Sequence, residues 1–108
     1  MAEKIKLVQG DNLPTILLTL TDPNGSPINL AAAVVRVYFR AAGASSVLSS
    51  ILCRPKTDGT DGQVEFDFSN GVLDVPPGSY EGEIEVNFGG LKQTVYEPLK
   101  FVVREQFQ

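Results

Sequence analysis

Three glutamates, Glu81, Glu83 and Glu85, occupy every second position of one segment and form the most conspicuous acidic cluster in the sequence. Carboxylates gathered in this way could hold a metal ion or work as a general acid and base. In an extended strand, however, side chains two positions apart project from the same face, about 7 Å from one another. A glycosidase-like pair would also need one carboxyl group in a desolvated cleft, which the pattern does not supply. We therefore predict a solvated outer face whose like charges oppose edge-to-edge aggregation, with no metal or catalytic role.

A second acidic segment contains Asp58 and Asp61 with intervening glycine and resembles part of a calcium-binding loop. An EF-hand loop needs a longer series of oxygen ligands that ends in a bidentate Glu, and this segment lacks that series. Asp and Gly are also favoured in tight turns, because Asp accepts hydrogen bonds from nearby backbone amides and Gly tolerates positive φ. The segment therefore predicts a turn and no calcium site.

The nucleophilic side chains lack the partners that would activate them. The sequence contains no His, so neither Cys53 nor any serine has the general base that nucleophilic catalysis most often uses. The serines considered are Ser45, Ser46, Ser49 and Ser50. Cys53 falls within a predicted strand, and we expect a buried or half-buried structural thiol. Gly89-Gly90 lacks the GK[ST] motif and the following helix of a phosphate-binding loop. We assign no catalytic, cofactor-binding or metal-binding residue and predict that the protein is not an enzyme.

Size and composition fit one soluble domain spanning residues 1–108. The chain is 43% apolar and 20% charged, which is enough to bury one core without a disulfide or a metal. With 13 acidic and 9 basic side chains the net charge is −4, and the cations are dispersed along the sequence. Both features argue against a nucleic-acid-binding protein. The first nine residues lack the apolar run of a secretory signal, and no apolar stretch is long enough to span a bilayer. We expect a protein made in the cytoplasm, with no membrane partner and no cofactor.

The dominant pattern is an alternation of apolar and polar residues, which is typical of strands with one face in a core and one in water. Val64, Phe66 and Phe68 form the clearest such face. Seven strands are predicted: 4–8, 15–21, 34–40, 47–53, 63–68, 79–88 and 91–104. Pro98 cannot donate to a central ladder, so we expect it to divide the last of these in two.

Turn residues separate the predicted strands, at 22–27, 58–62, 76–78 and Gly89-Gly90. Seven strands at short and even spacing predict an all-β fold, an antiparallel β-sandwich of about seven strands. The architecture would be immunoglobulin-like without the disulfide, since the Cys…Trp…Cys pattern of antibody domains is absent. A small closed barrel is the alternative. We expect Tyr38, Tyr80 and Tyr96 to fill the core together with the six phenylalanines, although one exposed Tyr could anchor a contact.

Several segments together resemble the N-terminal domain of tailed-phage baseplate upper proteins and related small phage tail and fibre modules. The resemblance is carried, in order, by residues 8–14, 17–21, 22–30, 33–40, 62–68, 77–88 and 93–96, and so covers nearly the whole chain. Two features depart from the family pattern. Ala31-Ala32-Ala33 stand where members often carry Thr-Gly-Ala, and the sequence stops at Gln108 where members often continue into a stalk or receptor-binding region. An adaptor or attachment role is therefore expected rather than receptor binding.

The resemblance implies a non-enzymatic structural protein of a phage virion, located in the tail or baseplate, that attaches fibres or receptor-binding proteins. Its partners would be other virion proteins, and the protein would form a homo-oligomer or occur in multiple copies in the assembly. Many copies around a symmetric tail would strengthen modest single contacts. One alternative is a capsid decoration or neck protein with an immunoglobulin-like sandwich. Another is a carbohydrate-binding module, which usually needs exposed aromatic platforms. The terminal segments 1–9 and 105–108 are candidate contact segments, and simple fraying of the termini is the alternative interpretation.

Overall fold

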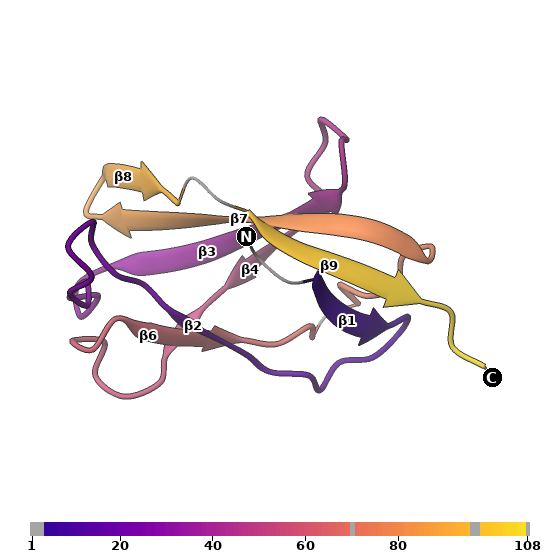
Figure 1. The fold of residues 1–108 in the computed structure, drawn as a ribbon, viewed down its shortest axis with the longest axis horizontal. Helices are drawn as coiled ribbons and strands as arrows, with labels where there is room; N and C mark the ends of the chain where they lie inside the picture. Colours follow the sequence, from indigo (N-terminus) through magenta and orange to yellow (C-terminus); the bar gives the residue numbers. More distant parts are fainter. Residues whose placement is uncertain (1–3, 70, 96–97, 108) are drawn as a thin grey trace.

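The computed structural model describes residues 4–69, 71–95 and 98–107, and all regular secondary structure in these residues is β (Figure 1). Within these ranges, nine strands form a six-stranded and a three-stranded sheet, which confirms the predicted β-sandwich. The strands are β1 (Lys4–Val8), β2 (Ile16–Thr19), β3 (Val34–Ala41), β4 (Ser49–Leu52), β5 (Arg54–Pro55), β6 (Gln63–Phe66), β7 (Gly78–Phe88), β8 (Leu91–Thr94) and β9 (Leu99–Arg104).

The long strand β7 organises the larger sheet, whose order is β1-β9-β7-β3-β4. One edge of β7 pairs with β3 along eight residues in antiparallel register, from Val34↔Asn87 to Ala41↔Tyr80. Its other edge is shared by two strands. The first half of β7 pairs with β9, and the second half pairs with β8. The smaller sheet has the order β2-β6-β5 and covers part of the larger one (Figure 1).

Alternation along the strands places the core between the two sheets, because every second side chain points inward. The inward face of β3 contributes Val35, Val37 and Phe39, all of them buried. Five aromatic rings meet at the centre of this core, and neighbouring rings pack edge-on, tilted or stacked at centroid distances from 5.1 to 6.5 Å. They belong to Phe39, Phe66, Phe68, Tyr80 and Phe101. The core thus joins the two sheets through aromatic contacts.

The predicted strands agree with the structure in position, with two differences. The prediction that Pro98 divides the last strand is confirmed, since β8 ends before it and β9 begins after it. The short strand β5 was not expected, because two residues show no alternation. The expectation of an entirely antiparallel sandwich is wrong at one place, where β1 runs parallel to β9 from Lys4↔Lys100 to Val8↔Arg104. Each of these strands is one alternating segment, and this pattern is the same whether the neighbouring strand runs parallel or antiparallel.

Two predicted turns show how local chemistry reverses the chain. The carboxylate of Asp22 accepts hydrogen bonds from the amides of Asn24 and Ser26, at 2.9 and 3.0 Å, and so closes the turn between β2 and β3. Between β7 and β8, Gly89 and Gly90 have φ of 62° and 103°. Positive φ at both central residues is what a tight two-residue hairpin requires, and glycine adopts it without steric cost.

The aromatic prediction is correct for most of the rings and wrong for two. Tyr80 is buried, and its hydroxyl donates to the carbonyl of Pro76. Tyr38 points outward instead, because its neighbours Val37 and Phe39 occupy the inward positions of β3. Phe107 lies beyond β9 and is 91% exposed. Tyr96 lies outside the described residues.

Candidate interaction surfaces

The three glutamates singled out in the sequence lie on the outer face of β7, as predicted, and neighbouring side chains of β3 engage two of them. Arg40 forms an ion pair with Glu81 at 3.2 Å, and the Tyr38 hydroxyl donates to Glu85 at 3.1 Å. Partial burial and this hydrogen bond raise the pKa of Tyr38. Glu83 is exposed between them. Among the described residues, no group of three or more His, Cys, Asp or Glu side chains could hold a metal ion.

The carboxylates of the Asp58–Gly62 turn are used by the turn itself. Asp58 accepts hydrogen bonds from the amide and the hydroxyl of Thr60, at 3.0 and 2.7 Å, and these bonds lower the pKa of Asp58. Asp61 accepts from the hydroxyl of Thr57 and the amide of Gln63, both at 3.0 Å. The predicted turn is therefore confirmed, and the hydrogen bonds explain why these residue types occur in it.

Cys53 lies between β4 and β5 with 7% of its surface exposed, so the prediction of a buried thiol is confirmed. Burial raises its pKa to about 12, although the nearby Arg54 opposes this effect. A thiol with such a pKa is neutral at physiological pH, whereas the nucleophilic form is the thiolate. The structure therefore places Cys53 in the core, where it packs as a small apolar residue.

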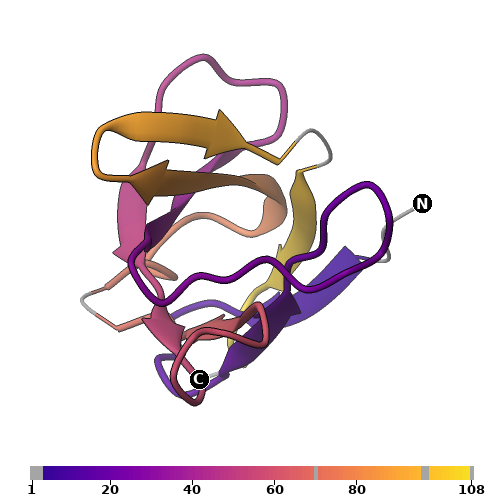
Figure 2. The same cartoon turned by 90° about the vertical axis from the view of Figure 1, so that its left-hand side faces the viewer.

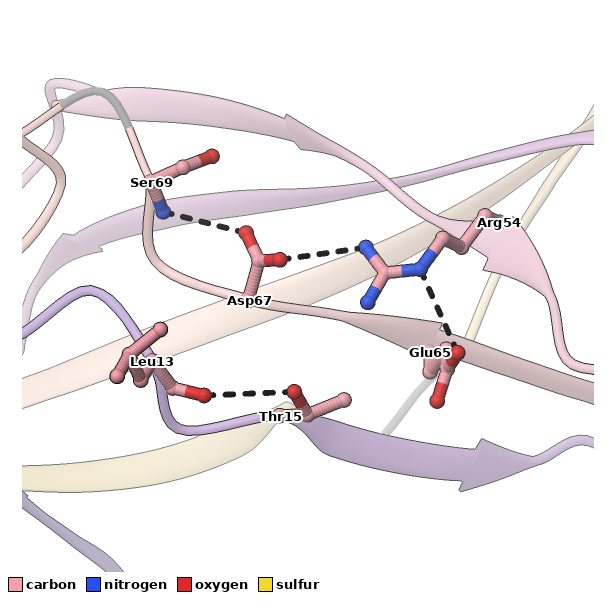
Figure 3. A network of polar contacts seen from close by, with 6 residues as sticks. All are labelled: Leu13, Thr15, Arg54, Glu65, Asp67 and Ser69. Carbon is pink, nitrogen blue, oxygen red and sulfur yellow. Dashed lines mark hydrogen bonds and ion pairs between the residues drawn. The ribbon is translucent and has the colours of Figure 1, made fainter.

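A polar network that the sequence analysis missed lies on the outer face of the smaller sheet (Figure 3). Arg54 of β5 contacts Glu65 at 3.4 Å and Asp67 at 3.3 Å, and the Ser69 amide donates to the second oxygen of Asp67. The bonds from Ser69, followed by the charge of Arg54, lower the pKa of Asp67. Glu65 and Asp67 stand two positions apart, so they share one face of an extended segment. This spacing could have predicted a basic side chain between or beside them. Pro55 has no amide hydrogen to donate to β6. The side-chain contacts of Arg54 therefore help to hold the two-residue strand β5 against β6.

A groove of about 840 Å³ with a mainly apolar lining is formed by residues of β7, β8 and the connection from β2 to β3. These segments meet at one end of the sandwich, which faces the viewer in Figure 2. The apolar lining of the groove includes Leu20 and Ile28 from the connection after β2, Val86 and Phe88 from β7, and Val95 after β8. Asp22, Asn29, Gln93 and Thr94 supply its polar lining. Among the described residues, β8 has no strand paired to its outer edge, and Leu91 at its start is 77% exposed. Apolar walls beside an open strand edge are features of protein-binding surfaces.

The loop between β3 and β4 projects from the molecule and carries two further exposed apolar side chains, Val47 and Leu48 (Figure 1). Val47 borders a hollow on the outer face of β3 and β7, whose other lining residues include Tyr38, Glu83 and Pro98. Loops on a rigid scaffold are common positions for binding residues. The sequence analysis did not predict these loop residues. It placed Val47 and Leu48 in the strand expected at 47–53, because the sequence does not distinguish an exposed apolar residue from one in a strand.

The two terminal contact segments predicted from the sequence differ in structure. From Lys4 onward the first segment is the strand β1, paired with β9, and Leu7 belongs to the core, so it is not a free arm. Residues 105–107 extend beyond β9 and are exposed, and the Phe107 ring lies 4.7 Å from the Arg104 guanidinium. Within the described part of the chain, no helix is long and apolar enough to cross a membrane.

Comparison with known proteins finds a likeness among solved structures. No protein-family model matches the chain, and no curated protein matches it. Among solved structures, the chain is similar to the N-terminal domain of phage TP901-1 ORF48, with a TM-score of 0.61 and 18% sequence identity. The similarity covers 96% of this chain and 85% of the other. At this level of identity the likeness establishes a shared fold: the β-sandwich described above also occurs as the N-terminal domain of a phage protein.

Proposed function

We propose that this protein is a structural component of a tailed-phage virion, where it works in the tail or baseplate as an adaptor that attaches fibres or receptor-binding proteins. One observation carries the proposal, namely the fold that nearly the whole chain shares with a domain of a phage protein. The resemblance of its ordered sequence segments to phage baseplate upper proteins points in the same direction.

The chemistry of the described residues supports an adaptor rather than an enzyme. The polar side chains that could have formed a reactive site are engaged in turns, in cross-strand pairs or in burial, as for Asp58, Glu81 and Cys53. The apolar surfaces instead lie at an end groove and on a projecting loop, where a neighbouring virion protein would cover them. Repetition of such contacts around a symmetric tail converts weak single contacts into firm attachment.

The first test is to locate the protein in the particle by electron cryomicroscopy of intact virions. Density for the sandwich at the tail tip, in several copies between the tail core and the fibres, is the expected result. Density on the capsid surface or at the neck would replace this proposal with a decoration role. Absence of the protein from purified virions would contradict any structural role.

A pair of variants then tests the groove. Leu91 is exposed at the start of β8 and pairs in register with Phe88, which lines the groove, whereas Leu13 is equally apolar, 89% exposed and far from β8 in the sequence. We expect Leu91→Glu to lower incorporation into virions several-fold, because it places a charge where an apolar partner surface would lie. Leu13→Glu, which makes the same change elsewhere, should be incorporated normally. Equal incorporation of both variants would show that the groove is not the contact surface.

A further inference from the structure

Four cations gather on the outer face of the two strands at one side of the larger sheet. Lys4 and Lys6 come from β1, and Lys100 and Arg104 come from β9. All four are exposed, and the parallel register places Lys4 directly beside Lys100. These strands lie at opposite ends of the sequence, so the cluster forms only when the chain folds. We call these four residues with Val8 and Val102 the basic face.

Arg104 contacts the Phe107 ring and the carbonyl of Glu105, but no carboxylate among the described residues pairs with a cation of the basic face. Glu81, the acidic residue in register with Lys100, is paired with Arg40 instead. Like charges on adjacent positions of neighbouring strands destabilise a sheet. The clustering of these cations therefore lowers the stability of the isolated protein, whose net charge is −4. It becomes favourable when an anionic group from another molecule lies against it.

The middle of the basic face is apolar. Val102 and Val8 line a groove of about 220 Å³ together with Lys6, Leu7 and Arg104. Among the described residues, the outer edge of β1 pairs with no other strand. The surface therefore combines a row of cations, an apolar floor and an open strand edge. A phosphate backbone would use only the first of these, whereas an extended acidic peptide with an apolar side chain on the same face as its carboxylates would use all three.

We propose that the basic face binds an extended acidic segment of a partner protein, with its carboxylates on the four cations and an apolar side chain in the groove. The complementarity of charge selects the partner, since the net charge of −4 repels anions whereas the four cations of this face attract them. This inference does not depend on the virion role. It specifies one contact by its chemistry, and it would stand for an adaptor in any assembly.

The probe is a fluorescein-labelled synthetic peptide of nine residues, with glutamate at positions 1, 3, 7 and 9, valine at position 5 and serine at the even positions, so that the carboxylates and the apolar side chain share one face of the extended peptide. Binding is followed by fluorescence anisotropy, and the contact surface by amide chemical shifts of the intact, isotope-labelled protein. We expect the shift changes to concentrate in residues 4–8 and 99–104, and the affinity to fall as salt is raised from 50 to 500 mM, roughly tenfold or more. A peptide with serine in place of this valine should bind several-fold more weakly, because it leaves the groove of the basic face empty.

Two double variants with the same change in charge provide the matched comparison. K6E/K100E reverses two cations of the basic face, whereas K56E/K92E reverses two exposed lysines outside it. We expect K6E/K100E to weaken binding at least tenfold and K56E/K92E less than twofold. Thermal melts followed by circular dichroism check that both variants remain folded. All four lysines are exposed, so neither pair of substitutions disturbs the core.

Three results would overturn the proposal. The first is equal weakening by the two double variants, which would mean that net charge alone attracts the peptide. The second is a set of chemical shift changes centred outside β1 and β9, or no change at millimolar peptide. The third is tighter binding of a short DNA duplex, or of vesicles containing anionic phospholipid, through the same four cations. That last result would assign the basic face to phosphate groups instead.

Discussion

Gly82 shows how a single missing side chain permits the packing of the core. It lies on the inward face of β7, and a Cβ atom placed there would come within 2.9 Å of both the Phe101 ring and a methyl group of Val37. We expect Gly82→Ala to destabilise the protein by about 1–3 kcal/mol, because a well-packed core resists an added methyl group. Urea unfolding measures the change. Ser79→Ala, on the exposed face of the same strand, should change stability by less than about 0.5 kcal/mol.

Cys53 gives a prediction that depends on pH. At pH 8 a thiol with a pKa of about 12 is ionised in only about 1 in 10⁴ molecules. We expect Ellman's reagent to label the folded protein very slowly at this pH and the urea-unfolded protein at once. Fast labelling of the folded protein, without any loss of circular dichroism, would contradict the buried position.

The raised pKa of Cys53 also fixes the direction in which it affects stability. Below the ordinary thiol pKa of 9.0, the thiol is neutral in both the folded and the unfolded chain, and its contribution is constant. Between 9.0 and about 12 the unfolded chain ionises first, so stability falls as pH rises. We expect the free energy of unfolding to decline more steeply from pH 9 to 11 for the natural protein than for Cys53→Val. Parallel slopes would show that other groups cause the decline.

At the scale of elements, the alternation of residues predicted where strands form but not how they pair. The buried face of a strand could be predicted, as for Val64 and Phe66, because a strand with one side in water has an apolar residue at every second position. Pairing depends on contacts between segments far apart in the chain, which no local pattern contains. For this reason the parallel contact of β1 with β9 was missed, and so was the gathering of Lys4 and Lys6 beside Lys100.

The role of β1 leads to an element-scale prediction. Because β1 completes the edge of the larger sheet and places Leu7 in the core, we expect deletion of residues 1–8 to cost about 2–5 kcal/mol of stability. The lost edge would also expose β9 to pairing with other molecules. Thermal melts and size-exclusion chromatography measure both effects. Deletion of residues 105–108 is the control, and its melting temperature should match that of the full chain. Equal melting of the two truncated proteins would show that β1 is dispensable.

At the scale of the whole molecule, the candidate surfaces were the part least visible in the sequence. The end groove takes its apolar lining from residues as distant as Leu20 and Val95, and each of them alone resembles an ordinary strand residue. The reactive-looking residues were easier to interpret, because Asp in a turn or Glu on an alternating strand has a local explanation. Local chemistry could therefore argue against particular sites from sequence, whereas the surfaces for binding needed the fold.

The shared core makes a last prediction about how the molecule unfolds. Phe68 follows β6 of the smaller sheet, and its ring lies 6.5 Å from that of Phe39 and 5.9 Å from that of Phe101, both in the larger sheet. Phe68→Ala should cost about 3–5 kcal/mol, a large share of the 5–15 kcal/mol that typically stabilises a domain. Phe107→Ala, which removes an exposed ring, should leave stability unchanged within about 0.5 kcal/mol.

Because the smaller sheet has only three short strands and packs against the same rings, it should not outlast the larger one. Amide resonances of β6 and β7 should therefore disappear at the same urea concentration, in the natural protein and in Phe68→Ala alike. Loss of the β6 resonances well before those of β7 would mean that the smaller sheet unfolds separately. In that case the aromatic cluster would stabilise the larger sheet alone, and a surface such as the end groove, which needs both sheets, would open and close with the smaller one.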